Sequence, residues 1–114
     1  MSKQEKKITL YLNEFKNTLK IKVDEDLLTK VTKGLGPSIY NADASKVSGS
    51  DAKELETVKN NFLIKKLGLS ASDKLDEAIT EVMDQMGSSN RNKYRVMVYY
   101  LLVLKFKKQS VYNS

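Results

Sequence analysis

The stretch that decides the fold is "NRNKYRVMVYYLLVLKFKK", which runs from Asn90 to Lys108. From Val96 to Leu104 its residues are apolar without interruption, so hydrophobic periodicity alone does not separate a buried helix from a buried strand. Length favours the helix, because a typical strand has about 5 or 6 residues and no turn signal divides this segment. A strand here would also lack a partner, since the other segments carry helical patterns. We therefore predict a C-terminal helix that is buried on most sides.

Four segments that precede this stretch carry apolar residues at spacings of three and four, which is typical of amphipathic helices. In the third segment, Lys66 lies on the same line as Val58 and Phe62. The apolar stripes are Ile8, Tyr11, Leu12, Phe15 and Leu19 in the first segment, Leu27, Leu28 and Val31 in the second, Leu55, Val58, Phe62, Leu63 and Leu67 in the third, and Leu75, Ala78, Ile79, Val82, Met83 and Met86 in the fourth.

Polar caps and glycines mark the ends of these four helices. Asp24, Asp51 and Ser72 are the expected N-caps of the second, third and fourth helix. The expected stops are Gly34 or Gly36 followed by Pro37 for the second helix, Gly68 for the third and Gly87 for the fourth. Short connections between helices set neighbours roughly antiparallel. The sequence thus predicts an all-α fold, a compact single-domain array of about five helices over residues 1–114 with a buried C-terminal helix.

Composition excludes several classes of chemistry. The chain has 114 residues, enough for one domain, and it contains neither cysteine nor histidine. Disulfides, thiolate nucleophiles, Ser-His-Asp and Cys-His arrangements and ordinary zinc or iron sites are therefore ruled out. We expect no catalytic residue, no metal and no cofactor, and hence no enzyme. An enzyme with carboxylate, lysine or tyrosine chemistry is the remaining catalytic possibility.

The expected location follows from hydropathy. Met1 is followed by "SKQEKK" with no signal-peptide-like apolar run, and no stretch reaches the roughly 18 apolar residues of a membrane span. The absence of cysteine fits a reducing compartment. We expect a cytoplasmic protein that does not enter a membrane.

An irregular loop at about 35–50 connects the second and third helices and is rich in glycine and serine. Backbone amides in such a loop could form an anion site, but the P-loop pattern is not met, because Ile39, Tyr40 and Asn41 occupy the places of its second glycine, its lysine and its hydroxyl residue. The alternative is a packing role.

In the packing interpretation Gly34 closes the second helix, and Ile39, Tyr40 and Val47 fold back over the edge of the core. Loops of more than about 12 residues in compact domains are often functional, so the binding interpretation stays open. Tyr40 and Asn41 are the candidate residues of a loop site.

Charge is distributed unevenly along the chain. Residues 70–87 hold five acidic residues and one lysine, a net charge of −4, whereas residues 88–114 hold six basic residues and no acid, a net charge of +6. We therefore expect the last two helices to attract each other. The acidic row consists of Asp73, Asp76, Glu77, Glu81 and Asp84. A row along one helix splays outward, so we interpret it as a solvated face and not as a magnesium site.

The basic residues near the C-terminus are candidate contacts for a protein partner or a nucleic acid. The whole chain has a net charge of +6 and a pI of about 9.4, and Tyr94 and Tyr112 offer stacking surfaces. The competing interpretation is a solvated rim around a buried helix. The candidate residues are Arg91, Lys93, Arg95, Lys105, Lys107 and Lys108.

Three stretches, in this order, resemble a known bacterial family of roughly this length. They are "KVTKGLGPSIYN" at residues 30–41, "KELETVKNNFLIKKLGL" at 53–69 and "NRNKYRVMVYYLLVLKF" at 90–106. The family is catalogued only as a domain of unknown function. The resemblance implies an all-helical domain and supplies no activity and no functional residues.

The function that these observations favour is that of a small non-enzymatic helical protein that binds another protein or itself. Nucleic-acid binding is the alternative. For the oligomeric state we expect a monomer or a weak homodimer. Exposure of Val96, Tyr99 and Val103 would favour the dimer, whereas a lid formed by the loop around Ile39 and Val47 would favour the monomer.

Overall fold

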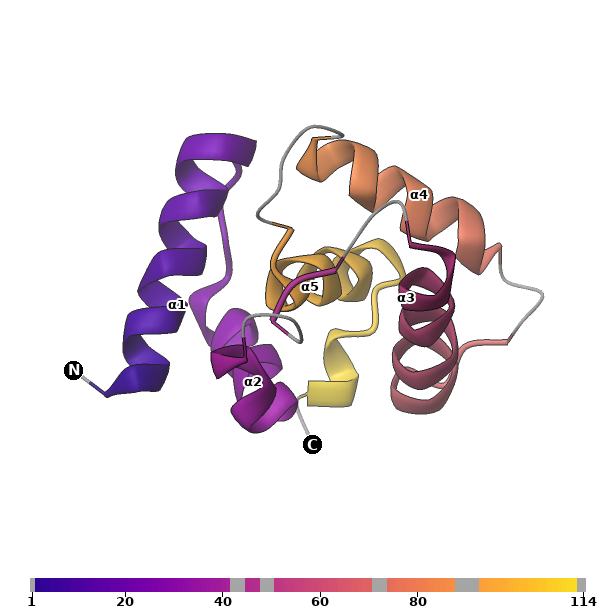
Figure 1. The fold of residues 1–114 in the computed structure, drawn as a ribbon, viewed down its shortest axis with the longest axis horizontal. Helices are drawn as coiled ribbons and strands as arrows, with labels where there is room; N and C mark the ends of the chain where they lie inside the picture. The colour runs from indigo at the N-terminus through magenta and orange to yellow at the C-terminus, as the bar shows by residue number, and fades with distance from the viewer. Residues whose placement is uncertain (1, 42–44, 48–50, 71–73, 88–92, 113–114) are drawn as a thin grey trace.

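The helix α5, Arg95–Lys105, lies at the centre of the molecule and carries the apolar run of the sequence (Figure 1). Every residue from Val96 to Val103 is buried, on all sides of the helix. The structure is a computed structural model and describes residues 2–41, 45–47, 51–70, 74–87 and 93–112. The prediction of a buried C-terminal helix is confirmed.

Four further α-helices surround α5 (Figure 1). They are α1 Lys3–Glu14, α2 Glu25–Leu35, α3 Ala52–Thr57 and α4 Leu75–Met86. Two of them continue as wider π-helical segments, α1 into η1 Phe15–Leu19 and α3 into η3 Val58–Lys66, and two 3₁₀ turns complete the chain, η2 Gly36–Tyr40 and η4 Gln109–Tyr112. The described residues form no strand, and an isolated bridge joins Lys46 to Tyr94. The predicted all-α array of five helices is confirmed.

Two of the predicted N-caps are confirmed. The Asp24 carboxylate accepts a hydrogen bond from the backbone N–H of Asp26 at 3.1 Å, and Asp51 accepts one from that of Lys53 at 3.0 Å. The prediction for α4 is wrong, because this helix begins at Leu75 with Lys74 at the N-cap position in a left-handed conformation (φ 55°). Ser72 itself lies outside the described residues.

Several helices end at residues with a positive φ. Gly36 (φ 63°) ends α2, which confirms the second of the two predicted stops, whereas Gly34 lies inside this helix and does not close it. Gly87 (φ 99°) ends α4 as predicted. α5 ends before Lys107 (φ 55°), whose N–H donates to the Leu104 carbonyl while that of Lys108 donates to the Val103 carbonyl. This pair of bonds is a Schellman-type cap. The predicted extension of the helix to Lys108 is therefore wrong. The chain changes direction at Lys107 and continues into η4.

The loop between α2 and α3 partly covers the core, as the packing interpretation predicts. Ile39 and Val47 are buried, whereas Tyr40 is 46% exposed, so its assignment to the core edge was wrong. Two backbone hydrogen bonds hold the described part of this loop on the start of α5. The Val47 N–H donates to the Lys93 carbonyl at 2.8 Å, and the Arg95 N–H donates to the Ser45 carbonyl at 2.7 Å.

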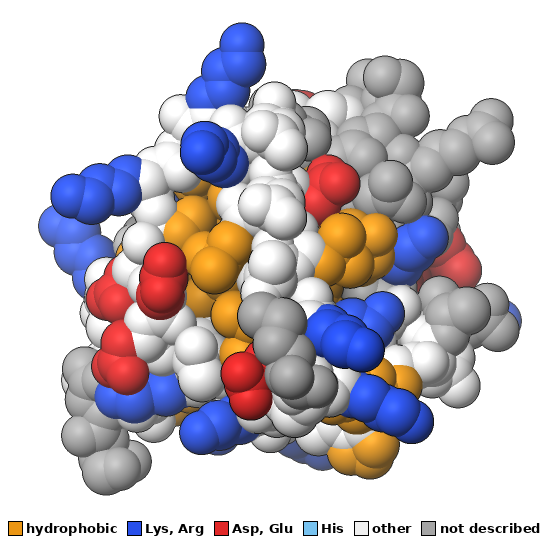
Figure 2. Space-filling view, turned by 90° about the vertical axis from the view of Figure 1, so that its left-hand side faces the viewer, with side chains coloured by type: hydrophobic (Ala, Val, Ile, Leu, Met, Phe, Trp, Pro, Cys, Tyr) orange, Lys and Arg blue, Asp and Glu red, His pale blue; other side chains and the backbone are white. Residues whose placement is uncertain are grey.

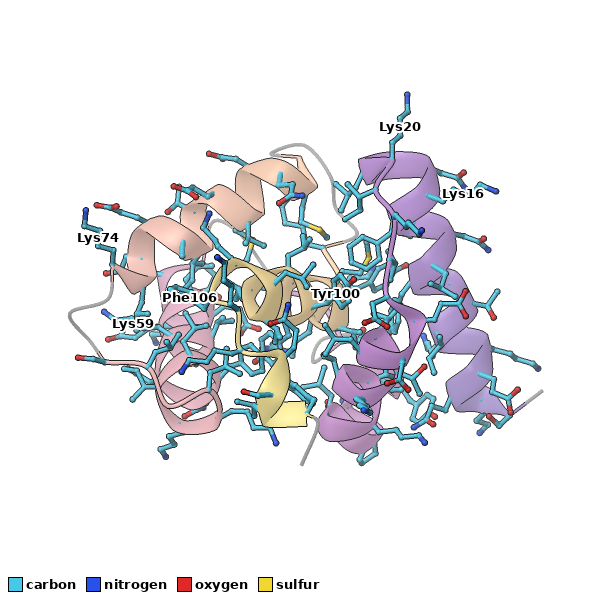
Figure 3. All side chains as sticks on the ribbon, turned by 180° about the vertical axis from the view of Figure 1, so that it is seen from behind. Lys16, Lys20, Lys59, Lys74, Tyr100 and Phe106 are labelled. Atoms are coloured by element: carbon cyan, nitrogen blue, oxygen red, sulfur yellow. The ribbon has the colours of Figure 1, made fainter. Side chains whose placement is uncertain are left out.

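The described neighbours enclose α5. Val96, Tyr99 and Val103 are all buried, so the exposed apolar stripe that would have favoured a dimer is not formed. The Tyr100 ring packs on Phe15 with 5.2 Å between centroids, and its hydroxyl accepts a hydrogen bond from the Asp24 N–H at 2.9 Å. Figure 3 shows Tyr100 inside the molecule, with Lys16, Lys20 and Lys74 pointing outward.

The helices are short compared with a membrane span. α5 has 11 residues, whereas a bilayer-spanning helix needs about 20. Among the described residues no helix has both the length and the apolar character to cross a bilayer. The radius of gyration of 13.2 Å matches the value of about 13 Å for a compact domain of about 100 residues.

Replacing Leu102 by alanine tests the central position of α5. The side chain is fully buried, so Leu102→Ala should lower the free energy of unfolding by about 2 to 5 kcal/mol. Leu104→Ala on the same helix is the control and should cost less, because Leu104 is only partly buried. A thermal melt of Leu102→Ala that coincides with that of the wild type would contradict the central position.

Two tyrosine-to-phenylalanine changes should act in opposite directions. The Tyr11 hydroxyl is buried and has no hydrogen-bond partner within the described part of the chain, so Tyr11→Phe should stabilise the fold by about 1 kcal/mol. Tyr100→Phe removes the bond to Asp24 and should cost about 0.5 to 1.5 kcal/mol. Urea denaturation measures the free energy of unfolding of both variants, and their m-values should equal that of the wild type. A loss of stability in Tyr11→Phe would mean that its hydroxyl has a partner.

Candidate functional site

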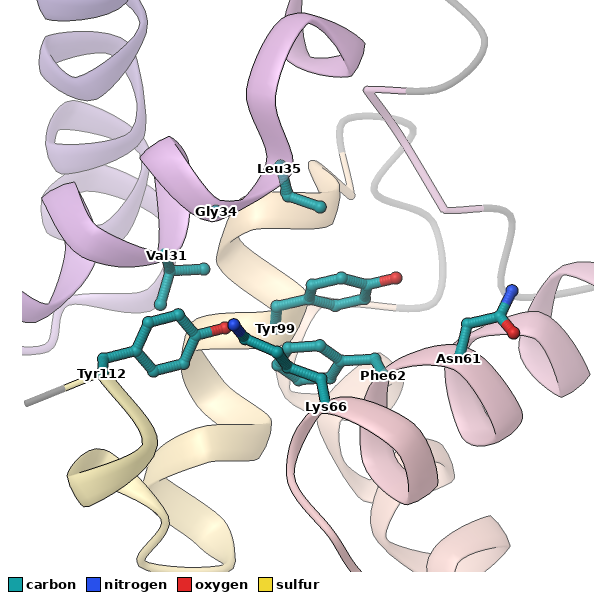
Figure 4. A pocket seen from close by; sticks show the side chains of 8 residues that line it. All are labelled: Val31, Gly34, Leu35, Asn61, Phe62, Lys66, Tyr99 and Tyr112. Carbon is teal, nitrogen blue, oxygen red and sulfur yellow. The ribbon is translucent and has the colours of Figure 1, made fainter. Parts of the chain in front are cut away.

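A cleft of about 250 Å³ opens between α2, η3, α5 and η4 (Figure 4). The four elements are far apart in sequence, and the packing around α5 brings them together. The lining residues are Val31, Gly34 and Leu35 from α2, Asn61, Phe62 and Lys66 from η3, Tyr99 from α5, and Tyr112 from η4. Apolar, aromatic and hydrogen-bonding side chains thus share one opening.

Two stacked aromatic rings form one wall of the cleft. The Phe62 and Tyr99 rings lie 3.8 Å apart between centroids with an interplanar angle of 12°. Both side chains are at least nine-tenths buried, so the pair is held by the core. On the opposite side Tyr112 packs on α2, where a Cβ added at Gly34 would lie 3.6 Å from its ring. The cleft therefore has aromatic side chains on two sides, of which the Phe62–Tyr99 pair is buried in the core.

Arg95 fixes the orientation of Tyr99. Its guanidinium donates a hydrogen bond to the Tyr99 hydroxyl at 3.1 Å and forms an ion pair with the Glu54 carboxylate. Burial by itself would lower the pKa of Arg95, but the bonds to Tyr99 and Glu54 outweigh it and raise the pKa above its ordinary value. Arg95 is therefore a permanent cation that links α3 to α5 behind the cleft.

Lys66 lies at the rim of the cleft, with its ammonium 5.2 Å from the centroid of the Tyr112 ring. Its side chain is exposed, and no acidic residue is among those that line the cleft. Burial, and after it the neighbouring Tyr99, raises the pKa of Tyr112 to about 12, so its hydroxyl keeps the proton at neutral pH. The cleft thus offers a cation and protonated hydrogen-bond donors.

The π-helical turns of η3 decide which side chains reach the cleft. On an α-helix, residues five apart point about 140° away from each other. In a π-helix the hydrogen bonds run from i to i+5, so residues five apart lie on the same side of the helix. Asn61 and Lys66 are related in this way and both line the cleft. A regular α-helix would have directed one of them elsewhere.

The basic candidates that the structure describes lie at both ends of α5 and not in one patch. Lys93 is buried and Arg95 pairs with Glu54, both near the start of α5. Lys105, at the other end of the helix and about 15 Å from Arg95 along the helix axis, pairs with Glu81. Lys107 is exposed and Lys108 is partly buried beyond the helix end, and Arg91 lies outside the described residues.

The face that carries α1 shows the same mixture of charges. Figure 2 shows Lys and Arg side chains spread around this face, with acidic and apolar side chains between them. A nucleic-acid surface normally gathers its basic residues in one stripe or patch. A role of the basic residues in binding stays a prediction.

The candidate loop residues Tyr40 and Asn41 do not line the cleft. Both are exposed. The Asn41 backbone takes part in the turn, because its N–H donates to the Ser38 carbonyl at 3.1 Å and its carbonyl accepts from the Ser45 N–H at 2.8 Å. The structure therefore gives them a position on the surface, and a loop site there stays a prediction.

An ion pair joins the acidic and basic segments as predicted, because Glu81 of α4 pairs with Lys105 of α5. Outside the basic segment, Lys59 of η3 pairs with Asp76 of α4 at 3.3 Å. These cations offset the repulsion along the acidic row. Within the described ranges no three acidic side chains come close enough to hold a metal ion, and Asp73 lies outside those ranges.

Sequence reasoning did not single out Leu35, Asn61 or Lys66 as site residues. One signal was present, because Lys66 lies on the line of apolar residues that contains Phe62. A charged residue on such a line must reach the edge of the core, where clefts open. No feature of the sequence pointed to Asn61, because an α-helical period places it on a different face of the helix from Phe62 and Lys66.

Comparison with protein families matches residues 10–110 to the family described as "Protein of unknown function (DUF2853)". The match covers most of the chain, and the resemblance noted in the sequence is thereby confirmed. Every residue that lines the cleft lies within the matched range except Tyr112. No curated protein matches the chain.

Two glycine substitutions test the backbone of the cleft. Gly34 has no left-handed conformation, and a Cβ there makes ordinary contact with Tyr112, so Gly34→Ala should stabilise α2 by about 0.5 to 1 kcal/mol. Gly36 has φ 63° and ψ −145°, a region that only glycine adopts without strain, so Gly36→Ala should cost about 1 to 3 kcal/mol. Thermal unfolding measures both. Equal effects of the two changes would contradict the assigned end of α2.

Proposed function

Because the chain belongs to this family, whose description assigns no activity, we propose a function from the geometry of the cleft. The domain is a non-enzymatic binding module that holds one side chain of a protein partner. The observation that carries the proposal is the stacked pair Phe62–Tyr99, which forms the wall of an open cleft. We place the protein in the cytoplasm, which the absence of cysteine from the sequence supports.

The size of the cleft favours a single side chain as its occupant. Sites for small molecules and cofactors usually have about 300 to 1,000 Å³, whereas this cleft has about 250 Å³. A nucleotide or a large cofactor would not be enclosed. An aromatic or aliphatic side chain that projects from a partner fits the volume and the apolar walls.

The residue types also favour a protein interface. Tyrosine and phenylalanine are enriched at the centres of interfaces, and the strongest contacts occur in preformed, well-packed pockets. Arg95 already holds Tyr99 in place before any partner binds. Binding therefore costs little side-chain entropy on this side of the interface.

Other functions receive less support from the geometry. The titratable side chains that line the cleft are Lys66, Tyr99 and Tyr112, which provide no carboxylate for acid–base chemistry. Nucleic-acid binding remains the alternative because the net charge is +6. Ion pairs with Glu54 and Glu81, however, already engage two of the basic residues proposed for it.

Photo-crosslinking in a lysate of the native cells tests the proposal. A photoreactive diazirine amino acid of about the size of leucine at Leu35, which leaves the cleft open, should give a crosslink to one protein that persists after nuclease treatment. The same group at Glu77, which is exposed on α4 outside the cleft, should not give that product. Gel separation and mass spectrometry identify the product.

A filled cleft supplies the matched control for this experiment. Asn61→Trp should abolish the crosslink from position 35, because Asn61 lines the cleft, whereas Asn60→Trp on the neighbouring exposed residue should preserve it. A nuclease-sensitive product would support the nucleic-acid alternative. Equal products from positions 35 and 77, or no product, would contradict the proposed function.

A further inference from the structure

The charge at the rim of the cleft determines which kind of partner segment fits. We propose that the cleft receives an acidic peptide segment in which Asp or Glu directly neighbours an aromatic residue, and that Lys66 binds the carboxylate while the ring occupies the cleft. This inference rests on the proposed function and adds the chemistry of the partner.

Lys66 has an unused charge that points to an anion. Four ion pairs occur among the described residues, and none includes Lys66; they are Lys30–Asp26, Lys59–Asp76, Arg95–Glu54 and Lys105–Glu81. The contact of Lys66 is with the Tyr112 ring, which holds the ammonium at the rim. A carboxylate that enters the cleft therefore finds a cation already in position.

The uncharged polar groups that line the cleft also favour an acceptor as ligand. The Asn61 amide and the Tyr112 hydroxyl can both donate hydrogen bonds, and Tyr112 remains protonated far above neutral pH. The Tyr99 hydroxyl accepts from Arg95, a bond that does not use its own proton. Donors thus predominate in the cleft, and a carboxylate accepts from several of them at once.

The arrangement of charge and rings sets the spacing within the partner segment. Lys66 follows Phe62 by four residues on η3, about one turn, so the ammonium lies beside the aromatic wall (Figure 4). A ligand that satisfies both must carry its carboxylate within one side-chain length of its ring. Adjacent acidic and aromatic residues in a peptide meet this condition.

A phosphate group fits this rim less well than a carboxylate. Phosphate sites usually combine arginine forks or the N-terminus of a helix with several donors. Lys66 lies in the last turn of η3, where the negative end of the helix dipole repels anions, and it repels a doubly charged phosphate more strongly than a singly charged carboxylate. A single lysine at such an end matches the single charge of a carboxylate.

Two capped dipeptides test the proposal by NMR titration of the full chain. N-acetyl-Asp-Phe-amide should give saturable shifts of the Val31 and Leu35 methyl groups and of the Asn61 side-chain amide. N-acetyl-Asn-Phe-amide, with the same shape and no charge, should bind about tenfold more weakly, as expected for the loss of one charge-assisted hydrogen bond.

Substitutions of neighbouring lysines separate the binding role of Lys66 from a structural one. Lys66→Gln should abolish the preference for the Asp peptide, and Lys66→Arg should retain it. Lys65→Gln is the matched control, because Lys65 lies in the same last turn of η3 and does not line the cleft. It should leave the preference unchanged. Loss of the preference in both glutamine variants would indicate a general charge effect and overturn the assignment to Lys66.

The remaining outcomes distinguish this inference from the proposed function. Equal binding of the two peptides to the wild type would overturn the carboxylate recognition, while crosslinking from Leu35 could still succeed. Absence of saturable shifts from the Asp peptide at millimolar concentration would also overturn it. The crosslinking experiment does not presuppose a carboxylate in the partner, so its failure would contradict the binding function itself and not only the chemistry of the partner.

Discussion

Burial of α5 on every side is the constraint on which the rest of the structure depends. An apolar helix of this kind is stable in water only if other elements cover all of its faces, and no single helix can do so. α1 contributes Tyr11, α2 contributes Leu28, and the loop after α2 contributes Ile39. The elements are therefore arranged as a shell, and the cleft opens where α2, η3 and η4 meet over the side of α5.

The same constraint explains why polar groups near α5 are engaged inside the molecule. Arg95, at the start of the helix, forms an ion pair with Glu54 on α3 and donates a hydrogen bond to the Tyr99 hydroxyl. The Tyr100 hydroxyl accepts a hydrogen bond from the backbone N–H of Asp24, the N-cap residue of α2. Buried polar groups need such partners, because an unpaired one costs about 1 to 3 kcal/mol. Arg95 and Lys105, two of the basic residues singled out in the sequence, thus form ion pairs inside the domain, and the exposed charge of the cleft comes from Lys66.

Much of the fold could be predicted because its signals are local. Periodic apolar residues, aspartate caps and the long run at Val96–Leu104 each act within one or two turns of chain, and the structure confirms the five helices they indicate. The errors occur where the backbone leaves the α-helical pattern. Lys74 and Lys107 adopt left-handed conformations that lysine disfavours, and the π-helical turns of η3 have no recognised sequence pattern.

The amino-acid sequence is sufficient to predict the all-helical class and the buried C-terminal helix, and it excludes chemistry that needs cysteine or histidine. Only the tertiary structure decided where a site can exist, because the cleft is formed by residues from 31 to 112 that meet through packing. The physical reason is that helices and clefts depend on contacts between residues at different distances along the chain. Helix formation depends on neighbours three or four positions away, whereas a cleft depends on which helices share a face of α5 and on the phase that a π-helical turn gives to Asn61 and Lys66.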